Sequence, residues 1–163
     1  MRTFLIALAV SALAWPASAA EGTFDQAMLR PETALKAAQA ALESCRQHGW
    51  QVAVAVVDRG GNVQVVLRDR YAGPHTVPVA TGKAWTAMSF RTNTGELVTL
   101  TGPGMPQAGM RNVPGATIIG GGIKIEAAGA LLAAIGVSGA PGGEADDICA
   151  KAGLAAIEDA LNF

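Results

Sequence analysis

Two segments of the sequence, residues 52–70 and 120–147, each have the pattern of a β-hairpin that turns at glycine and is followed by a helix. In the first segment an apolar run ends at Asp58, a second apolar run begins at Val63, and two glycines lie between them. Glycine supplies the positive φ angles that tight hairpin turns require, and an Asp carboxylate accepts hydrogen bonds from the turn amides ahead of it. The second hairpin is predicted over residues 123–126 and 130–137.

Helical patterns precede and follow these hairpins. Pro31 stands where a first helical residue tolerates proline, apolar residues then recur at helical spacing, and His48-Gly49 ends the pattern. We interpret His48 as a cap of this helix, because a glycine follows it. A second helix is predicted to begin downstream of Pro74. Residues 142–143, both glycine, precede a last helix with an acidic first turn, which the helix dipole favours.

One more strand is predicted at residues 116–119, after a Gly- and Pro-rich loop over residues 101–114. Together with the two hairpins it makes five strands. Hairpins rather than parallel crossovers indicate an α+β fold, with a five-stranded antiparallel sheet and helices packed on it. If helices cover one face of such a sheet, the other face stays apolar, so we expect self-association.

The first 19 residues have the pattern of a signal peptide. Arg2 precedes an apolar run over residues 4–14, and Ala17-Ser18-Ala19 is a small-x-small cleavage motif. The apolar run is shorter than the roughly 20 residues that span a bilayer. We therefore predict cleavage after Ala19, export to the periplasm or the exterior, and a single domain over residues 20–163.

Charge and motifs exclude several classes of function. The chain has 12 basic and 13 acidic side chains, and the basic ones are scattered, which argues against nucleic acid as a partner. No second apolar stretch is long enough to cross a membrane. There is no His-Glu-x-x-His motif, no phosphate loop and no cysteine cluster. The three glycines at 120–122 do not open a helix, so we interpret them as a bend where another backbone approaches.

Five short motifs occur in an order and spacing that resemble one family. They are Asp58-x-Gly60-Gly61-Asn62, Arg68-Asp69, the run Ala80–Ala87, the run Ile135–Gly139, and Glu144-x-Asp146. These motifs, spread over nearly all of residues 20–163, resemble the GlcG/HbpS family of haem-binding proteins, which includes the C-terminal domain of PduO-type proteins. The resemblance implies a profilin-like α/β sandwich, a symmetric homo-oligomer, and haem as a cofactor held without a covalent bond (b-type).

His75 is the leading candidate for a haem ligand. It follows Pro74 in a turn before the second helix, where a rigid turn can present an imidazole to a cleft, and one histidine is enough for a five-coordinate haem iron. The alternative is an exposed histidine with no ligand. Met105, Met110 and Tyr71 are the other candidate ligands, although loop methionines more often fill apolar gaps.

Cationic side chains can pair with the carboxylates that haem carries. Lys83 is a candidate because it lies in an otherwise small and apolar helix, which gives its charge a need for a partner. The other candidate cofactor-binding residues are Arg68, Arg111 and Thr76. Arg68 is followed by Asp69, so a solvated surface pair is the alternative for that arginine.

Cys45 and Cys149 leave two interpretations open. An exported protein can join them as a disulfide, or they can pack as buried thiols. The sequence lacks Cys-x-x-Cys-His, which excludes covalent haem attachment of the c type.

The leading hypothesis is an exported protein that binds haem, or a related tetrapyrrole, for scavenging, storage or redox sensing. The alternative is an enzyme or accessory protein that acts on a small carboxylate or a corrinoid-linked metabolite, as the resemblance implies through the family's links to glycolate use and cobalamin metabolism. A third hypothesis is a scaffold with no ligand.

Overall fold

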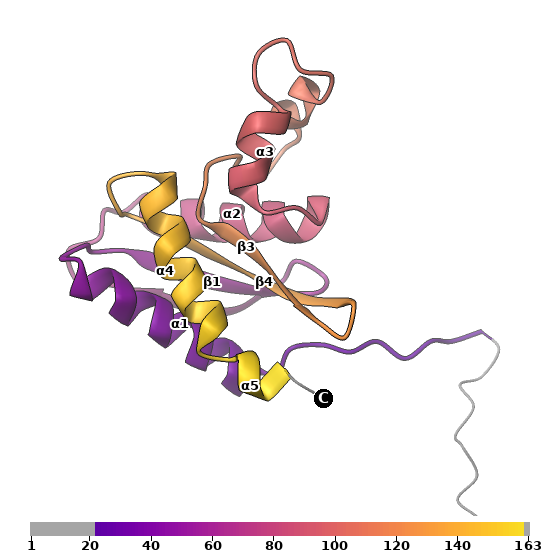
Figure 1. Cartoon of the computed structure of the whole chain (residues 1–163), viewed down its shortest axis with the longest axis horizontal. Coiled ribbons are helices and arrows are strands. Elements are labelled where there is room, and N and C mark those ends of the chain that lie inside the picture. The colour runs from indigo at the N-terminus through magenta and orange to yellow at the C-terminus, as the bar shows by residue number, and fades with distance from the viewer. Residues whose placement is uncertain (1–21, 162–163) are drawn as a thin grey trace, which may run out of the picture.

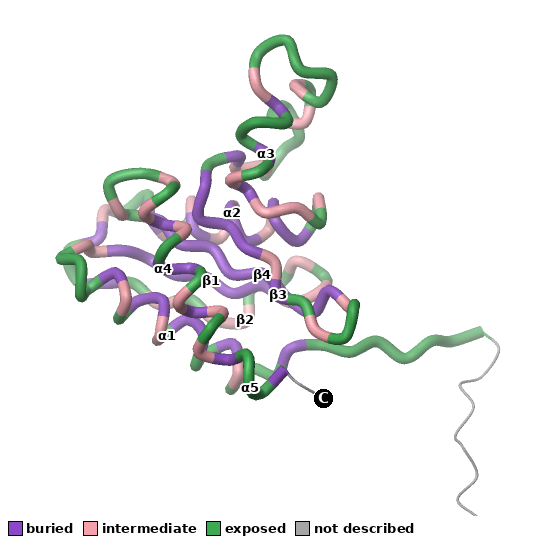
Figure 2. Tube along the Cα trace, in the orientation of Figure 1, coloured by how far each residue is buried: buried purple, intermediate pink, exposed green. Residues whose placement is uncertain are grey.

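A four-stranded antiparallel sheet lies between two helical layers in the computed structural model, which describes residues 22–161 (Figure 1). The strands are β1 (Ala53–Asp58), β2 (Val63–Arg68), β3 (Gly122–Ala127) and β4 (Ala130–Ser138), in the order β2-β1-β4-β3. The two predicted hairpins are thus present, and their inner strands, β1 and β4, pair with each other. Because β1 and β4 are central, nearly all of their residues are buried (Figure 2).

Helices cover both faces of this sheet. The helices are α1 (Pro31–Gln47), α2 (Thr76–Phe90), α3 (Thr94–Leu100), α4 (Gly143–Ala155) and α5 (Glu158–Leu161), with a 3-10 turn, η1 (Ala108–Asn112), after α3. Figure 1 shows α1 and α4 side by side on one face and α2 on the other. The segment from α3 through η1 projects away from the sheet, and most of it is exposed (Figure 2).

The helix α1 forms where the sequence predicts it. Pro31 occupies its first turn, and His48 is its C-cap, with Gly49 at a φ of 77° directly afterwards. The buried side of α1 is mostly alanine. Small residues allow a close approach to α4, where a Cβ on Gly153 would lie 2.7 Å from the carbonyl oxygen of Ala37. The prediction that His48 caps this helix is confirmed.

The turn of the first hairpin is held by Asp58, as predicted. Its Oδ1 accepts hydrogen bonds from the backbone N–H groups of Gly60 and Asn62, at 2.8 and 2.9 Å. Gly61 takes a φ of 80°. The carboxylate therefore substitutes for backbone acceptors in a turn that needs glycine.

The prediction of a fifth strand at residues 116–119 is wrong. The outer edge of β3, where such a strand would pair, is hydrogen-bonded to side chains at the start of α3. The N–H of Gly122 donates to Thr94 Oγ1 at 2.8 Å, and the N–H of Lys124 donates to Asn93 Oδ1 at 3.0 Å. The Thr117 N–H instead donates to Thr86 Oγ1 of α2, at 2.8 Å. An apolar run alone does not reveal that its pairing partner is already bonded.

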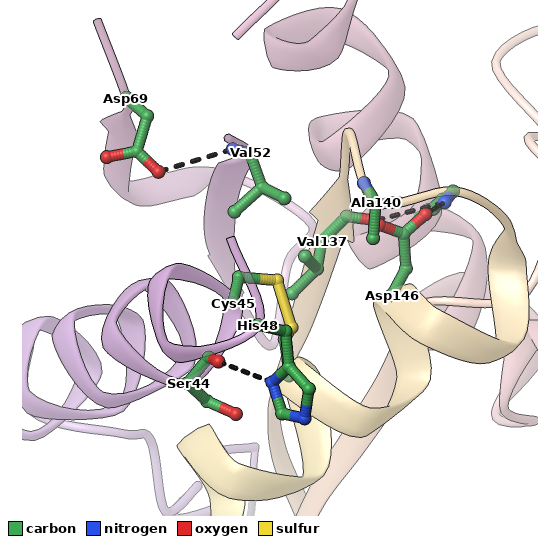
Figure 3. Close-up of a disulfide and its surroundings, with 10 residues drawn as sticks. Ser44, Cys45, His48, Val52, Asp69, Val137, Ala140 and Asp146 are labelled. Atoms are coloured by element: carbon green, nitrogen blue, oxygen red, sulfur yellow. Dashed lines mark hydrogen bonds and ion pairs between the residues drawn. A yellow bond between two sulfur atoms is a disulfide. The ribbon is translucent and has the colours of Figure 1, made fainter. Parts of the chain in front are cut away.

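A disulfide joins Cys45 of α1 to Cys149 of α4 (Figure 3). Their Cα atoms are 5.5 Å apart, the two residues are 104 positions apart in the chain, and both are fully buried. Of the two interpretations that the sequence left open, a disulfide or two buried thiols, the structure has the disulfide. The bond fixes the two helices of one layer to each other.

The predicted signal peptide, residues 1–19, lies outside the described residues. Within residues 22–161, every helix is too short or too polar to traverse a bilayer.

Candidate functional site

A cavity of about 610 Å³ opens where two helices begin and a central strand ends. It lies between the start of α2, the end of β4 at Ser138, and the start of α4. Its walls mix apolar and polar groups, as cofactor and ligand sites do. The lining residues are Gly49, Trp50, Gln51, Tyr71, Gly73, His75, Thr76, Val79, Lys83, Ile119, Ser138, Gly139, Ala140, Pro141, Gly142, Gly143 and Asp146.

Local sequence explains why the chain opens here. The strand β4 ends at Ser138, and Gly139 follows with a φ of 130°, a conformation that favours glycine. A Cβ on Gly139 would lie 2.6 Å from the carbonyl oxygen of Gln51, so the loop also needs glycine for space. The chain then reaches Gly142, whose extended backbone starts α4.

A buried ion pair lies in the cavity wall. Lys83 of α2 and Asp146 of α4 are both almost fully buried, and Lys83 Nζ lies 2.6 Å from Asp146 Oδ2. The same ammonium donates to the carbonyl oxygen of Val137 at 3.0 Å. Asp146 Oδ1 accepts a hydrogen bond from the Ala140 N–H, also at 3.0 Å (Figure 3). The pair therefore ties the two helical layers together past the end of β4.

Burial raises the pKa of the Asp146 carboxyl above its ordinary value. The hydrogen bond and the positive charge of Lys83 lower it, the Ala140 N–H lowers it further, and the neighbouring charge of Asp147 raises it. Burial is the largest of these effects. Lys83 is therefore the main group that favours the charged form of this carboxyl.

The glycine run 120–122 forms the wall behind this pair. A Cβ on Gly121 would lie 2.6 Å from the Cβ of Asp146, and one on Gly122 would lie 2.5 Å from the carbonyl oxygen of Lys83. A Cβ on Gly120 would lie 2.9 Å from backbone atoms of Gly143. The prediction that another backbone approaches here is confirmed, because both α2 and α4 do so.

His75 lies at the rim of the cavity, as the N-cap residue of α2. The residue is exposed, and a Cβ on Gly73 would lie 2.7 Å from its Cε1, so the imidazole rests against glycine backbone. Neither ring nitrogen has a hydrogen-bond partner within the part of the chain that the structure describes. The ring is free to accept a ligand through either nitrogen.

The structure brings three of the predicted site residues together and leaves four elsewhere. His75, Thr76 and Lys83 line the cavity, and so does Tyr71. Arg68, Met105, Met110 and Arg111 do not line it.

Two of the four outlying residues, Arg68 and Arg111, have local hydrogen bonds in the described chain. The Arg68 guanidinium donates to the carbonyl oxygen of Ala72, and that of Arg111 donates to the carbonyl oxygens of Thr101 and Val98. Met105 and Met110 belong to the projecting segment after α3. Their assignment to a cofactor site stays a prediction.

Sequence reasoning gave no role to Ser138 of the cavity, and it placed Asp146 only in the acidic first turn of the last helix. Asp146 stood in a quoted motif, Glu144-x-Asp146, but its partner lies 63 positions away. The available signal was that a lysine in an apolar helix needs a counter-ion. The sequence does not identify which of several carboxylates provides it.

A second cavity, of about 430 Å³, lies at the other end of the sheet. Its charged lining residues are Asp25, Arg59, Arg91 and Glu126. Asp25 belongs to the extended segment before α1. Because this cavity is lined by charges of both signs and none of them is buried, we place the candidate site in the cavity between α2 and α4.

The antiparallel sheet with helices on both faces defines a small α+β domain with a cavity at one end of the sheet. A family model described as the haem-degrading protein HbpS-like family matches residues 29–155. The chain belongs to this family.

Solved structures agree with this assignment. The crystal structure of a double mutant of HbpS from Streptomyces reticuli is 41% identical, with a TM-score of 0.78, and covers 88% of this chain and 97% of that one. The crystal structure of a PduOC:heme complex is 29% identical, with a TM-score of 0.75, over 80% of this chain and 96% of that one.

A Citrobacter freundii relative, an uncharacterized 15.0 kDa protein in the dhaT-dhaS intergenic region, is 32% identical over 108 residues, which are 65% of this chain and 76% of the relative.

Proposed function

We propose that this protein binds haem, without a covalent bond, in the cavity between α2 and α4, with His75 as the axial ligand. The observation that carries the proposal is an imidazole with no internal partner at the rim of a cavity of about 610 Å³. The family match and the haem complex of PduOC, a structural relative, support the choice of ligand.

The residues present fit such a ligand. Imidazole nitrogen is a common axial donor to haem iron, and Tyr71 and Trp50 add aromatic surface at the same cavity. Val79, Ile119 and Pro141 contribute apolar wall for a flat macrocycle. Bound haem would supply redox and oxygen chemistry, and the protein would contribute the axial ligand, the apolar wall and control of solvent access.

The test is a hemin titration followed by visible absorbance, comparing His75→Ala with His48→Ala. His48 is the matched control, because it is the other histidine and its Nδ1 lies 2.8 Å from the Ser44 carbonyl oxygen at the end of α1 (Figure 3). We expect saturable binding by the wild-type protein, a shifted Soret band and weaker binding in His75→Ala, and an unshifted Soret band in His48→Ala, which removes only a ring stacked on Trp50 at the cavity. An unchanged spectrum in His75→Ala would transfer the ligand assignment to Tyr71, Met105 or Met110.

Export, biological role and assembly are part of the same proposal. A signal peptide over residues 1–19 would place the protein in the periplasm or outside the cell. The roles to test there are haem scavenging, haem storage and haem-based redox sensing. Exposed apolar side chains on β2, Val63 and Val66, support assembly into a homo-oligomer. N-terminal sequencing of the exported protein and light scattering of the purified protein test these two points.

Haem breakdown is the second candidate function, because the family's description includes it. Incubating the haem complex with ascorbate and oxygen separates the two candidates. Loss of the Soret band with release of iron indicates breakdown, and a stable spectrum indicates binding alone.

A further inference from the structure

The start of α4 presents hydrogen-bond donors that nothing in the described chain uses. The first three N–H groups of the helix, those of Gly143, Glu144 and Ala145, have no acceptor among residues 22–161, and no side chain caps the helix. Such groups carry the positive end of the helix dipole. Gly142 and Gly143 line the cavity, so this helix end opens into it.

A second, independent feature is the hydroxyl of Ser138. Ser138 ends β4 and lines the same cavity, yet only 5% of the residue is exposed. Its hydroxyl has no hydrogen-bond partner in the described part of the chain. The hydroxyl is not among the enclosed polar atoms that lack a partner, so it is open to the cavity, where an oxygen of a bound ligand can accept its hydrogen bond.

The remaining charges near this helix end leave the donors free. Asp146 is occupied by Lys83 and the Ala140 N–H, and Asp147 Oδ1 accepts the Gly121 N–H at 2.6 Å. Glu144 is exposed and does not line the cavity. The start of α2, on the other side, adds the positive end of a second dipole.

From these observations we infer that the cavity binds a carboxylate group at the start of α4, held by the free N–H groups of that helix start, where Gly143 lines the cavity, and by the Ser138 hydroxyl. Backbone donors at a helix start suit an anion, and a carboxylate has two oxygens to share between them and a hydroxyl. The carboxylate has two possible sources, a haem propionate or a free small carboxylate. The inference does not depend on haem binding, because both sources share this chemistry.

The decisive variant is Gly142→Asp. A Cβ at Gly142 meets nothing within 4 Å, and its φ of −177° is open to any residue. Aspartate is a preferred N-cap, so the variant occupies the same N–H groups with its own carboxylate while keeping or raising the unfolding midpoint. Gly109→Asp is the matched control, because it adds the same charge at a residue outside the cavity with nothing within 4 Å.

The probes are hemin, hemin dimethyl ester and sodium propionate, each titrated into the full protein. We expect Gly142→Asp to weaken binding of the carboxylate-bearing probe about tenfold or more, Ser138→Ala to weaken it several-fold, and Gly109→Asp and the surface variant Ser89→Ala to leave it unchanged. Hemin that binds far better than its ester identifies a propionate as the source, and saturable binding of propionate itself identifies a free carboxylate.

Failure of this inference is distinguishable from failure of the proposed function. If hemin and its ester bind equally, Gly142→Asp has no effect and propionate does not bind, the carboxylate site is refuted, while a loss in His75→Ala still supports haem binding. If propionate binds and responds to Gly142→Asp but hemin does not bind, the carboxylate site stands and the haem proposal falls.

Discussion

Replacing Lys83 with methionine should destabilise the protein severely. The substitution keeps most of the side chain's length but removes an ammonium that bonds Asp146 Oδ2 and the Val137 carbonyl oxygen. Asp146 would be left buried with the Ala140 N–H as its remaining donor. Removing one partner of a buried ion pair typically costs about 3–5 kcal/mol, because the other charge stays buried and unpaired. For a domain of this size that loss lowers the urea midpoint by about 2 M.

The loss should depend on pH. Burial already raises the pKa of Asp146 above its ordinary value of 3.8, and losing Lys83 removes the main influences that lower it. With a folded-state pKa above the unfolded one, the folded state favours the protonated acid, so the contribution of Asp146 to stability falls as the pH rises through the folded pKa. The deficit of Lys83→Met is therefore largest at neutral pH and shrinks as the pH approaches 4.

Urea unfolding followed by far-UV circular dichroism measures this at pH 7 and pH 5. The matched control is the double variant Lys83→Met with Asp146→Leu, which replaces both charges by apolar groups and should recover most of the lost stability. A cost below about 1 kcal/mol for Lys83→Met, equal at both pH values, would refute the conclusion that the pair is desolvated and mutually dependent.

Two other predictions concern the core. Replacing Cys45 and Cys149 with alanine removes the disulfide that joins residues 104 positions apart, and it should lower the free energy of unfolding by about 4–5 kcal/mol in the chain-entropy model. Thermal unfolding of this variant checks the value. An unchanged midpoint would show that the bond does not stabilise the fold. Gly136→Ala places a Cβ against backbone atoms of Ala80 in α2 and should lower the free energy of unfolding by about 1–3 kcal/mol or more. The control Gly109→Ala meets nothing within 4 Å and should leave the free energy of unfolding unchanged. Equal unfolding midpoints for the two variants would contradict the close contact between β4 and α2.

Much of the fold is predictable because it is encoded locally. The Asp58 turn, the proline start of α1 and the glycine after His48 each act on residues next to them in the chain. The strand prediction for residues 116–119 was wrong, because their apolar pattern suits a strand but the edge of β3 is already bonded to Asn93 and Thr94. That competition depends on tertiary structure.

In the candidate site, too, the local features were predictable from the sequence and the features that depend on tertiary structure were not. The sequence singled out His75 and Lys83 by residue type and local context, and the structure places both at one cavity. It could not identify Asp146 as the partner of Lys83, or Ser138 as an unpaired hydroxyl, because both facts arise only when α2, β4 and α4 meet.

The position of the haem iron decides whether His75 binds haem in the cavity between α2 and α4. Crystals of the protein grown with hemin locate the iron by its anomalous scattering, independently of any variant. We predict iron within bonding distance of a His75 ring nitrogen, with the macrocycle in the cavity between α2 and α4. Iron beside Met105 or Met110 on the projecting segment, or haem at the cavity near Arg59 and Arg91, would contradict it.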